Sequence, residues 1–369
     1  MVYIISDVKK SLGLEWIITI LINKYSLKLI LINCDNSSLE VLAKKKKIPY
    51  IKINYKKKYI DFFPSLIRLM LVLLEWKPKI VHCHLRKASL IGLIGSYLLR
   101  IKKRIYTRHH GVESKNNKLE NLLDKIVFYL ATNIIAISEE IKLITISNHK
   151  FVSNKITKIH HGFNLNYVKD LKKNKVNSLI RKYKIKKNYY VMGVVSRLVD
   201  WKNVDKIVDA FYIYNNYYNP NSVLVLSNVK FETSYSKKIL NKLKCLNKNS
   251  YRLIEFEEDI YSLYRCFDLF IHIPKPGGYE AFGQTYVEAM LSKVPTIFSK
   301  SGIAKEIGRD RVNTYFCNPE KIYSILKGMK YHSNLSKNSV RLVNSAYNLA
   351  LNKFSLDDHI SSLNQLYRL

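Results

Sequence analysis

Short runs of β-branched and apolar residues alternate with amphipathic stretches along almost the whole chain, and this alternation constrains the fold strongly. Repeated strand–helix units of this length predict an α/β protein with a parallel, doubly wound sheet and right-handed crossovers. The first series of predicted strands comprises Val2–Ser6, Leu27–Asn33, Ile80–His84, Arg104–Thr107 and Asn133–Ile137. The predicted helices between them are Glu15–Lys24, Ser65–Trp76, Ala88–Leu99 and Lys118–Ala131.

A second series follows a polar, lysine-rich stretch at Asn164–Lys187, in which no clear strand pattern is visible. Its predicted strands are Tyr190–Val195, Val223–Ser227, Leu253–Phe256, Leu269–Ile273 and Thr296–Ser299. Its predicted helices are Asn203–Tyr217, Ser236–Leu246, Ile260–Cys266 and Gly283–Ser292, and three more are predicted after Lys321. Because 369 residues are too many for one ordinary core, we expect two domains, 1–170 and 171–352, with a linker near 165–185.

The composition is that of a folded protein, with 47% hydrophobic and 24% charged residues. Five scattered cysteines without a CxxC pair indicate a reducing compartment, and they argue against both a disulfide framework and a zinc site. No signal peptide is visible, and no segment reaches the roughly 18 apolar residues that a membrane span needs. We therefore expect a cytoplasmic protein, with Leu66–Trp76 and Ser89–Ile101 as core helices.

The net charge of +34 has three interpretations. The first is a general compositional bias toward lysine, and the second is attraction to an anionic membrane surface. The third is nucleic-acid binding, which is the weakest because no helix-turn-helix, RNP, KH or zinc-finger pattern is present. We therefore expect no nucleic-acid partner.

The segment Gly277–Pro295 combines a glycine-bearing loop, a helical pattern and the approach to an apolar strand. It carries two carboxylates, of which Glu280 precedes Gly283 and is expected in the loop, while Glu288 lies on the helix. A unit of this kind presents polar groups at the carboxyl edge of a parallel sheet, so both acids can face one cleft. For two acids alone, a surface loop followed by an amphipathic helix is the better interpretation.

A cationic pair follows the first strand of the second series, where Arg197 ends a strand pattern and Lys202 precedes a helix. A guanidinium and an ammonium at this place can bind phosphate oxygens with help from helix amides. With 62 basic residues in the chain, such a pair also arises easily by chance.

Histidines mark two strand ends in the first half, at His82 and His84 and again at His109 and His110. Without a third fixed ligand their spacing has little specificity for a metal. A histidine beside a glycine turn at a strand end is placed to contact a sugar or a phosphate. A local structural role for His109 or His110 is about as well supported.

In their order along the chain, these residues resemble glycosyltransferase family 4, whose members are retaining enzymes that use nucleotide-diphosphate sugars. The matching residues of the second half are Arg197, Leu198 and Lys202, then Glu280, Ala281, Phe282, Gly283, Glu288, Ala289 and Pro295. Those of the first half are Gly13-Leu14-Glu15, VHCH ending at His84, TRHHG ending at Gly111, Ala136–Ser138 and His161–Asn164. The resemblance covers nearly the whole chain, and it implies the GT-B fold of two Rossmann-like domains facing a central cleft.

The resemblance also implies a role for each of these residues. Arg197, Lys202 and Gly13 would bind the donor diphosphate, and Glu288 would bind the ribose of the nucleotide. Glu280 would position the donor sugar together with the loop residues Phe282, Gly283 and Gln284. His110, with His109 as the neighbouring candidate, would contact the sugar at the reaction centre, so the expected catalytic residues are His110, His109 and Glu280.

No Asp-x-Asp motif is present, so we expect no metal and no cofactor, and the two cations would take the place of a metal ion at the diphosphate. The resemblance implies same-face attack without a covalent intermediate. The expected acceptor is a glycan or a lipid-linked molecule, in surface polysaccharide or glycolipid synthesis at the inner face of the membrane. The last helix, about 353–369, would pack back on the first domain.

Two departures from the family pattern concern the nucleotide contacts. Leu12 stands where the family usually has a second glycine beside Gly13, and Leu226–Val229 replaces a glycine-bearing strand end. Two other functions stay open at this point, namely a sugar-nucleotide epimerase with the same fold and a basic binding protein without catalysis.

Overall fold

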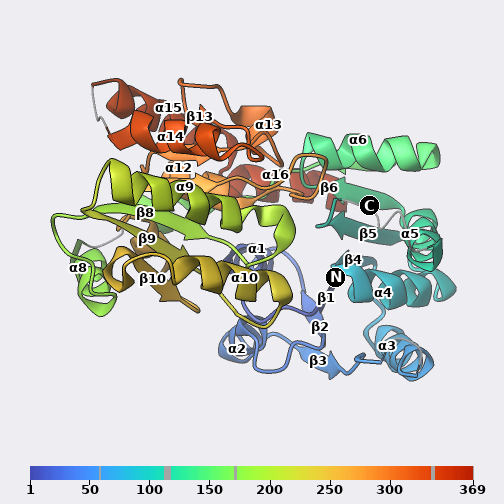
Figure 1. Ribbon diagram of the computed structural model, residues 1–369. Helices are drawn as coiled ribbons and strands as arrows, with labels where there is room; N and C mark the ends of the chain where they lie inside the picture. The colour runs from blue at the N-terminus through green and yellow to red at the C-terminus, as the bar shows by residue number, and fades with distance from the viewer. Residues whose placement is uncertain (58–59, 112–117, 170–172, 334–336, 369) are drawn as a thin grey trace. The chain divides into compact units, whose positions relative to one another are not determined.

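The computed structural model describes residues 1–57, 60–111, 118–169, 173–333 and 337–368, and it divides into two compact units (Figure 1). Unit 1 comprises Met1–Phe163 and Leu356–Leu369, and unit 2 comprises Asn164–Ser355. The boundary predicted from the sequence is residue 170, within the polar stretch. The structure instead begins unit 2 directly after Phe163, because the expected linker is partly helical and belongs to unit 2.

Unit 1 is built on a seven-stranded sheet in the order β3-β2-β1-β4-β5-β6-β7, in which every adjacent pair is parallel. Its strands are β1 (Val2–Ser6), β2 (Lys28–Ile32), β3 (Tyr50–Ile53), β4 (Ile80–His84), β5 (Lys103–Arg108), β6 (Asn133–Ala136) and β7 (Ile156–Lys158). Every residue of β1 and β4 is buried, as expected for central strands of a parallel sheet that is covered on both faces.

The helices of unit 1 connect consecutive strands. They are α1 (Leu12–Leu21), α2 (Ser38–Lys45), α3 (Phe62–Trp76), α4 (Arg86–Leu98), α5 (Lys118–Leu130) and α6 (Glu139–Asn148), with a 3-10 turn, η1, at Lys150–Val152. Local sequence sets where these helices begin, because the hydroxyls of Ser11 and Ser138 accept the first free backbone N–H groups of α1 and α6.

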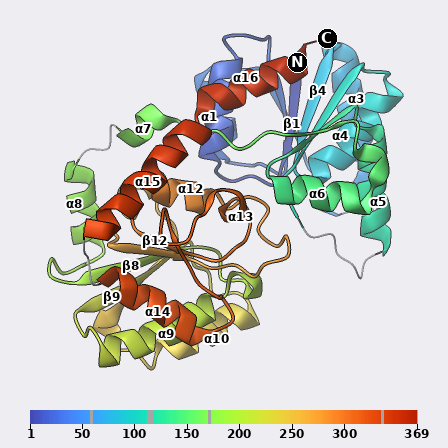
Figure 2. The ribbon, with the colours of Figure 1, turned by 90° about the horizontal axis from the view of Figure 1, so that it is seen from above.

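The C-terminal helix α16 (Leu356–Tyr367) belongs to unit 1 and lies beside α1 (Figure 2). Its last residue, Tyr367, is buried and its hydroxyl contacts the hydroxyl of Tyr3 and Nδ1 of His82, the latter at 2.7 Å. His359 on the same helix contacts the backbone oxygen of His160 through Nδ1 at 2.6 Å. The end of the chain thereby completes the core of unit 1.

Unit 2 is built on a six-stranded parallel sheet in the order β10-β9-β8-β11-β12-β13. Its strands are β8 (Tyr190–Val195), β9 (Ser222–Ser227), β10 (Tyr251–Ile254), β11 (Leu269–His272), β12 (Thr296–Phe298) and β13 (Tyr315–Phe316). Its helices are α7 (Leu165–Lys169), α8 (Lys173–Lys182), α9 (Val204–Tyr217), α10 (Ser234–Leu243), α11 (Ile260–Tyr264), α12 (Gln284–Leu291), α13 (Ala304–Ile307), α14 (Ile322–Ser333) and α15 (Lys337–Lys353), with 3-10 turns η2 (Asp200–Lys202) and η3 (Lys248–Ser250). The two units therefore share the doubly wound, Rossmann-like architecture that the alternation predicted.

Several elements differ from the sequence prediction. The predicted linker at 165–185 contains the helices α7 and α8, and β10 begins two residues before the predicted strand at Leu253. Sequence analysis did not predict β3, β7 or β13, which have four, three and two residues and give little periodicity to detect. It also missed α2, α6 and α13, which are short or, in the case of α6, weakly amphipathic.

Candidate active site

The sheet of unit 2 reverses its strand order between β8 and β11, and the segments that leave these two strands carry the predicted site residues. In doubly wound sheets, ligands bind outside the carboxyl ends of the strands at such a point. Arg197 follows the end of β8, and Lys202 ends the turn η2. Glu280 lies in the loop after β11, as the sequence predicted.

The structure joins two of these residues directly. The Lys202 ammonium donates to the Glu280 carboxylate in a buried ion pair, with each side chain 10% exposed. His272, the last residue of β11, lies with Nε2 3.0 Å from Oε2 of the same carboxylate. Because an ionised carboxylate can only accept, His272 donates from Nε2 in this contact.

The environment of this cluster sets its charge. Burial alone would raise the pKa of Glu280, but the hydrogen bond from His272 and the charge of Lys202 lower it to about 2. Burial and the Lys202 charge lower the pKa of His272 to about 4, against the pull of Glu280. At neutral pH the cluster therefore holds an ionised carboxylate and a neutral imidazole. Burial also lowers the pKa of Lys202, although Glu280 opposes this shift.

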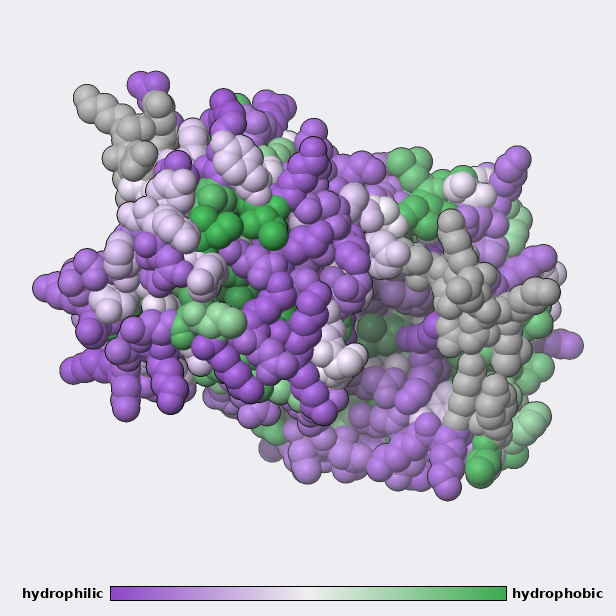
Figure 3. All heavy atoms as spheres, viewed as in Figure 1, coloured by the Kyte–Doolittle hydropathy of each residue, from purple (hydrophilic) through white to green (hydrophobic). Residues whose placement is uncertain are grey.

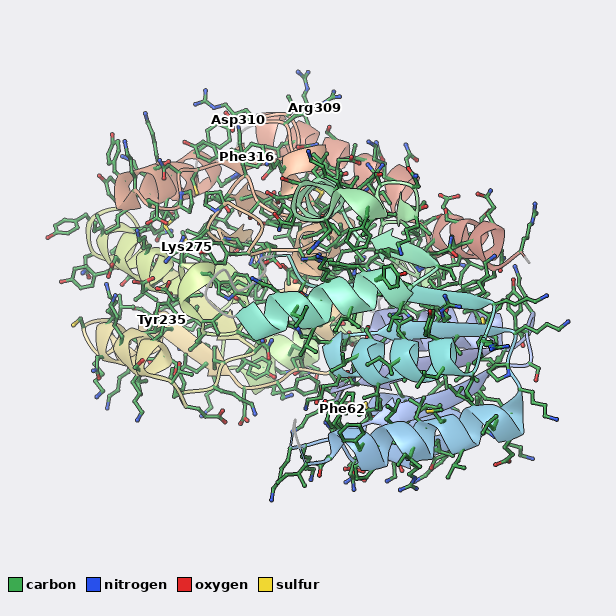
Figure 4. The ribbon with its side chains drawn as sticks, turned by 90° about the vertical axis from the view of Figure 1, so that its right-hand side faces the viewer. Phe62, Tyr235, Lys275, Arg309, Asp310 and Phe316 are labelled. Atoms are coloured by element: carbon green, nitrogen blue, oxygen red, sulfur yellow. The ribbon has the colours of Figure 1, made fainter. Side chains whose placement is uncertain are left out.

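Two further contacts hold the lysine and the loop in place. The Lys202 ammonium lies 4.4 Å from the centre of the Trp201 ring, a cation–π distance. Lys275, labelled in Figure 4, donates its backbone N–H to the oxygen of Trp201 at 2.8 Å, and its ammonium lies 2.5 Å from Asp200. These contacts fasten the segment after β11 to the turn that carries Lys202.

Arg197 has an exposed side chain, and within the described part of the chain it has no ion pair. Its charge contributes to the lowered pKa of Lys202, which places the two cations in each other's field. A guanidinium in this position is free to bind an anion that approaches the carboxyl edge of the sheet.

The loop that carries Glu280 leads into α12 through Gly283, whose φ of 78° is in the left-handed region. Phe282 is 2% exposed and its ring meets the Phe354 ring edge-on, with centres 5.9 Å apart. Phe282 therefore anchors the loop by packing against Phe354. This structural role is additional to the predicted role at the donor sugar. Gln284 is exposed and opens α12, where backbone N–H groups of the first turn point out of the helix.

Glu288 lies on α12 with a different partner from Glu280. The hydroxyl of Tyr264, at the end of α11, donates to Glu288 at 2.9 Å. Burial raises the pKa of Glu288 to about 7, although this hydrogen bond lowers it. The two acids are thus distinct, since one is a fully charged ion-pair partner and the other is half protonated near neutral pH.

We expect Glu288→Gln to flatten the decline of stability between pH 5 and 7. The folded pKa of Glu288 lies above the usual value of 4.5, so the folded state binds more protons than the unfolded state in this range. Its contribution is therefore fully present at acid pH and is lost as the pH rises through 7, whereas glutamine does not titrate. Thermal unfolding of the unaltered protein and of Glu288→Gln from pH 5 to 8 measures the difference. If stability changes with pH in the same way in both proteins, the pKa of Glu288 is not raised in the folded state.

In unit 1, the sheet reverses its order between β1 and β4, and the histidines lie at this edge. His84 ends β4 and its Nδ1 lies 3.2 Å from Nε2 of His109. His109 also stacks on His161, with ring centres 5.6 Å apart. Burial, followed by the charges of His110 and His359, lowers the pKa of His109 to about 4, so this ring is neutral at pH 7.

His110 faces a different group, with Nε2 3.7 Å from Oδ2 of Asp124 on α5. Asp124 also accepts from Arg86 at 3.1 Å. Burial would raise the pKa of Asp124, but His110 and Arg86 lower it below its usual value. Gly13, predicted in a turn, lies instead in the first turn of α1, which begins at Leu12.

The structure thus unites Lys202 with Glu280 in unit 2, sets Arg197 in the field of Lys202, and gives Glu288 separate partners. It adds His272, Tyr264 and Asp124, which sequence analysis did not select. His272 had a signal, since it is the last residue but one of the predicted strand Leu269–Ile273, whereas no pattern predicted the Tyr264 and Asp124 contacts. Among the described residues, no group of three His, Cys, Asp or Glu side chains is arranged to hold a metal ion.

Two units, each built on a doubly wound parallel sheet, are the architecture of the GT-B fold. Two family models match the chain in tandem. The model described as Glycosyltransferase Family 4 matches residues 32–167, and the model described as Glycosyl transferases group 1 matches residues 176–349. Together the two models identify the chain as a glycosyltransferase with the GT-B fold.

Relatives agree with this assignment. The capsular polysaccharide biosynthesis glycosyltransferase CapM of Staphylococcus aureus is 30% identical over 239 residues, which cover 63% of this chain and 61% of CapM. Among solved structures, HepE of Anabaena, in complex with UDP and glucose, has a TM-score of 0.84 at 19% identity and covers 99% of this chain and 98% of its own. A glycosyltransferase from Rickettsia africae has a TM-score of 0.81 at 19% identity, covering 99% and 97%. These two structures share the fold.

Proposed function

We propose that the chain transfers a glycosyl group, with retention and without a metal ion, from a nucleotide-diphosphate sugar to a glycan or lipid-linked acceptor. The buried Lys202–Glu280–His272 cluster beside the exposed Arg197 is the observation that carries this proposal. It offers cations for a departing diphosphate and a fixed carboxylate for a sugar hydroxyl at the same edge of one sheet.

The transfer reaction separates charge in the transition state, and the protein must stabilise these charges. The bond from the anomeric carbon to the phosphate oxygen breaks, so negative charge grows on the diphosphate and positive charge grows on the sugar. Arg197 would bind the diphosphate by its guanidinium fork, and the Lys202 charge nearby would stabilise the growing negative charge. The acceptor oxygen forms the new bond on the face that the phosphate leaves, and its proton passes to the departing phosphate oxygen.

Glu280 suits a positioning role in this reaction. With a pKa of about 2 and a cation as its partner, it stays ionised and is a poor proton donor at neutral pH. An ionised, buried carboxylate accepts hydrogen bonds from sugar hydroxyls and thereby fixes the orientation of the donor sugar. Glu288, with its pKa of about 7, would accept from the ribose hydroxyls, a contact that favours its ionised form.

The relatives support the substrate classes. The HepE structures contain UDP, glucose and UDP-glucose, which makes a UDP-sugar the first donor to try. CapM acts in capsular polysaccharide biosynthesis, which supports a polysaccharide pathway for this chain. The histidines of unit 1 support an acceptor-side role for the edge at His109 and His110, where the neutral imidazole of His109 can exchange hydrogen bonds with hydroxyl groups.

A panel of UDP-, GDP- and ADP-sugars tested by thermal shift identifies the donor. A ligand at 100 times its Kd is expected to stabilise the folded protein by about 2.7 kcal/mol. Arg197→Ala should weaken this donor at least about tenfold, because a charge-assisted hydrogen bond to phosphate is lost. Arg181→Ala is the matched control, since Arg181 is exposed on α8, which leads into the amino end of β8. Equal effects of the two variants, or no shift with any nucleotide sugar, would reject the proposed donor site.

A further inference from the structure

Helix α3 of unit 1 exposes a row of large apolar side chains. Phe63, Ile67, Leu71 and Leu74 are 66%, 58%, 61% and 52% exposed. Figure 4 labels Phe62 at the N-terminal end of this helix, and Figure 3 shows hydrophobic side chains at the lower right, where Figure 1 places α3. We call these four residues the α3 face.

The α3 face is continuous along the helix. Its members are spaced by four, four and three residues, so their side chains fall within an arc of about 80°. The opposite side of the helix is also apolar, since Leu66, Leu69 and Leu73 are buried and α3 packs against α4. The sequence therefore predicts a core helix, yet the four large apolar side chains of the α3 face are exposed. A soluble protein rarely leaves such a row uncovered unless it binds something.

Basic residues border the α3 face at both ends. Exposed cations near it are Lys56 and Lys57 before the helix, Arg68 within it, and Lys77 and Lys79 after it. Two acids accompany them, Asp61 and Glu75. The Asp61 carboxylate accepts the backbone N–H groups of Lys56 and Lys57, so it is engaged locally at the helix start. The surroundings of the row are net positive.

We propose that the α3 face docks on an anionic lipid surface. A row of Phe, Ile and Leu flanked by lysine and arginine matches the boundary between acyl chains and acidic headgroups. A second copy of the chain fits less well, because a two-fold contact through α3 would bring these same cations against each other. Among the described residues no helix is long and apolar enough to cross a membrane.

Docking through α3 bears on the acceptor. Helix α3 follows β3, so its N-terminal end lies at the carboxyl edge of the unit 1 sheet, the edge at which β4 ends in His84. A lipid-linked acceptor held in the membrane would meet the protein on this side. This step rests on the proposed function, whereas the docking itself does not.

Vesicle flotation with full-length protein tests the proposal. Ile67→Glu/Leu71→Glu is expected to lower partition into phosphatidylglycerol-containing vesicles at least about tenfold, since two apolar contacts are lost and two negative charges are added. The control Val41→Glu/Leu143→Glu makes the same charge change at residues of unit 1 that are 61% and 58% exposed. Its partition into the vesicles should fall less than that of Ile67→Glu/Leu71→Glu. Zwitterionic phosphatidylcholine vesicles should bind the unaltered protein more weakly.

Equal losses in the two double variants would show attraction by net charge alone and would overturn a docking face. Equal binding to both kinds of vesicle would overturn the anionic requirement. A dimer in sedimentation that Ile67→Glu/Leu71→Glu disperses, without vesicle binding by the unaltered protein, would assign the face to a second copy. The donor thermal shift is measured on the same variants, so a protein that docks but binds no nucleotide sugar refutes the proposed function and leaves the docking intact.

Discussion

Lys202→Ala is expected to reduce sugar transfer at least about 100-fold and to lower the free energy of unfolding by about 3 kcal/mol. The rate falls because a cation beside the departing diphosphate is lost, and such groups contribute most in the transition state. The stability falls because the Glu280 side chain, 10% exposed, loses its ion-pair partner and keeps only the hydrogen bond from His272. Chemical denaturation and initial rates with the identified donor measure the two effects.

A nearby lysine supplies the control for this variant. Lys206 pairs with Glu320, but the two side chains are 25% and 51% exposed, so Lys206→Ala should cost less than about 1 kcal/mol and leave transfer unchanged. A second variant separates charge from packing. Lys202→Met/Glu280→Gln removes both charges and should recover most of the stability without recovering transfer. If Lys202→Ala transfers sugar normally, or if the double variant does, Lys202 has no role at the diphosphate.

The architecture could be predicted from the sequence because each domain repeats the same local pattern, an apolar strand followed by an amphipathic helix. Buried strands such as β1 and β4 are continuous apolar runs, and the helices between them have a helical period. The strands that escaped prediction, β3, β7 and β13, are short and lie toward the sheet edges. They exist because neighbouring strands pair with them, and such pairing is set by tertiary structure rather than by local pattern.

The candidate site was predictable as a set of residues but not as a set of contacts. Arg197, Lys202 and Glu280 were selected by their order, yet Lys202 and Glu280 are 78 residues apart, and no spacing rule reveals that one neutralises the other. His272 completes this pair from the end of β11. Its role follows from its position at the strand switch point, which is known only once the strand order is known.

Helix α3 is a second feature that the sequence could not predict, because part of an apolar helix is exposed. Its composition predicts burial, and its inner face is buried, but the number of neighbours that cover a helix is a property of the fold. The exposure of the four residues of the α3 face is therefore known from the structure and could not be predicted from the sequence.

Gly283→Ala is expected to cost about 3 kcal/mol in stability and to lower sugar transfer more than about 100-fold. A new Cβ would lie 2.6 Å from the Tyr286 ring and 3.1 Å from Cγ of Glu280, at a φ of 78° that alanine adopts only with strain. Tyr286 is fully buried and cannot give way, so the loop must move and carry Glu280 with it. Displacing a positioning carboxylate by even about 1 Å is costly for a reaction that depends on alignment.

Gly277→Ala separates strain from collision in the same loop. Its φ is 96°, again in the left-handed region, but a new Cβ there meets nothing within 4 Å. It should therefore cost only the backbone strain, about 1 kcal/mol, and leave most of the transfer activity. If both glycine variants lose activity equally, flexibility of the whole loop matters rather than the placement of Glu280. If neither does, the loop does not position the donor sugar, and Glu280 serves the stability of unit 2 alone.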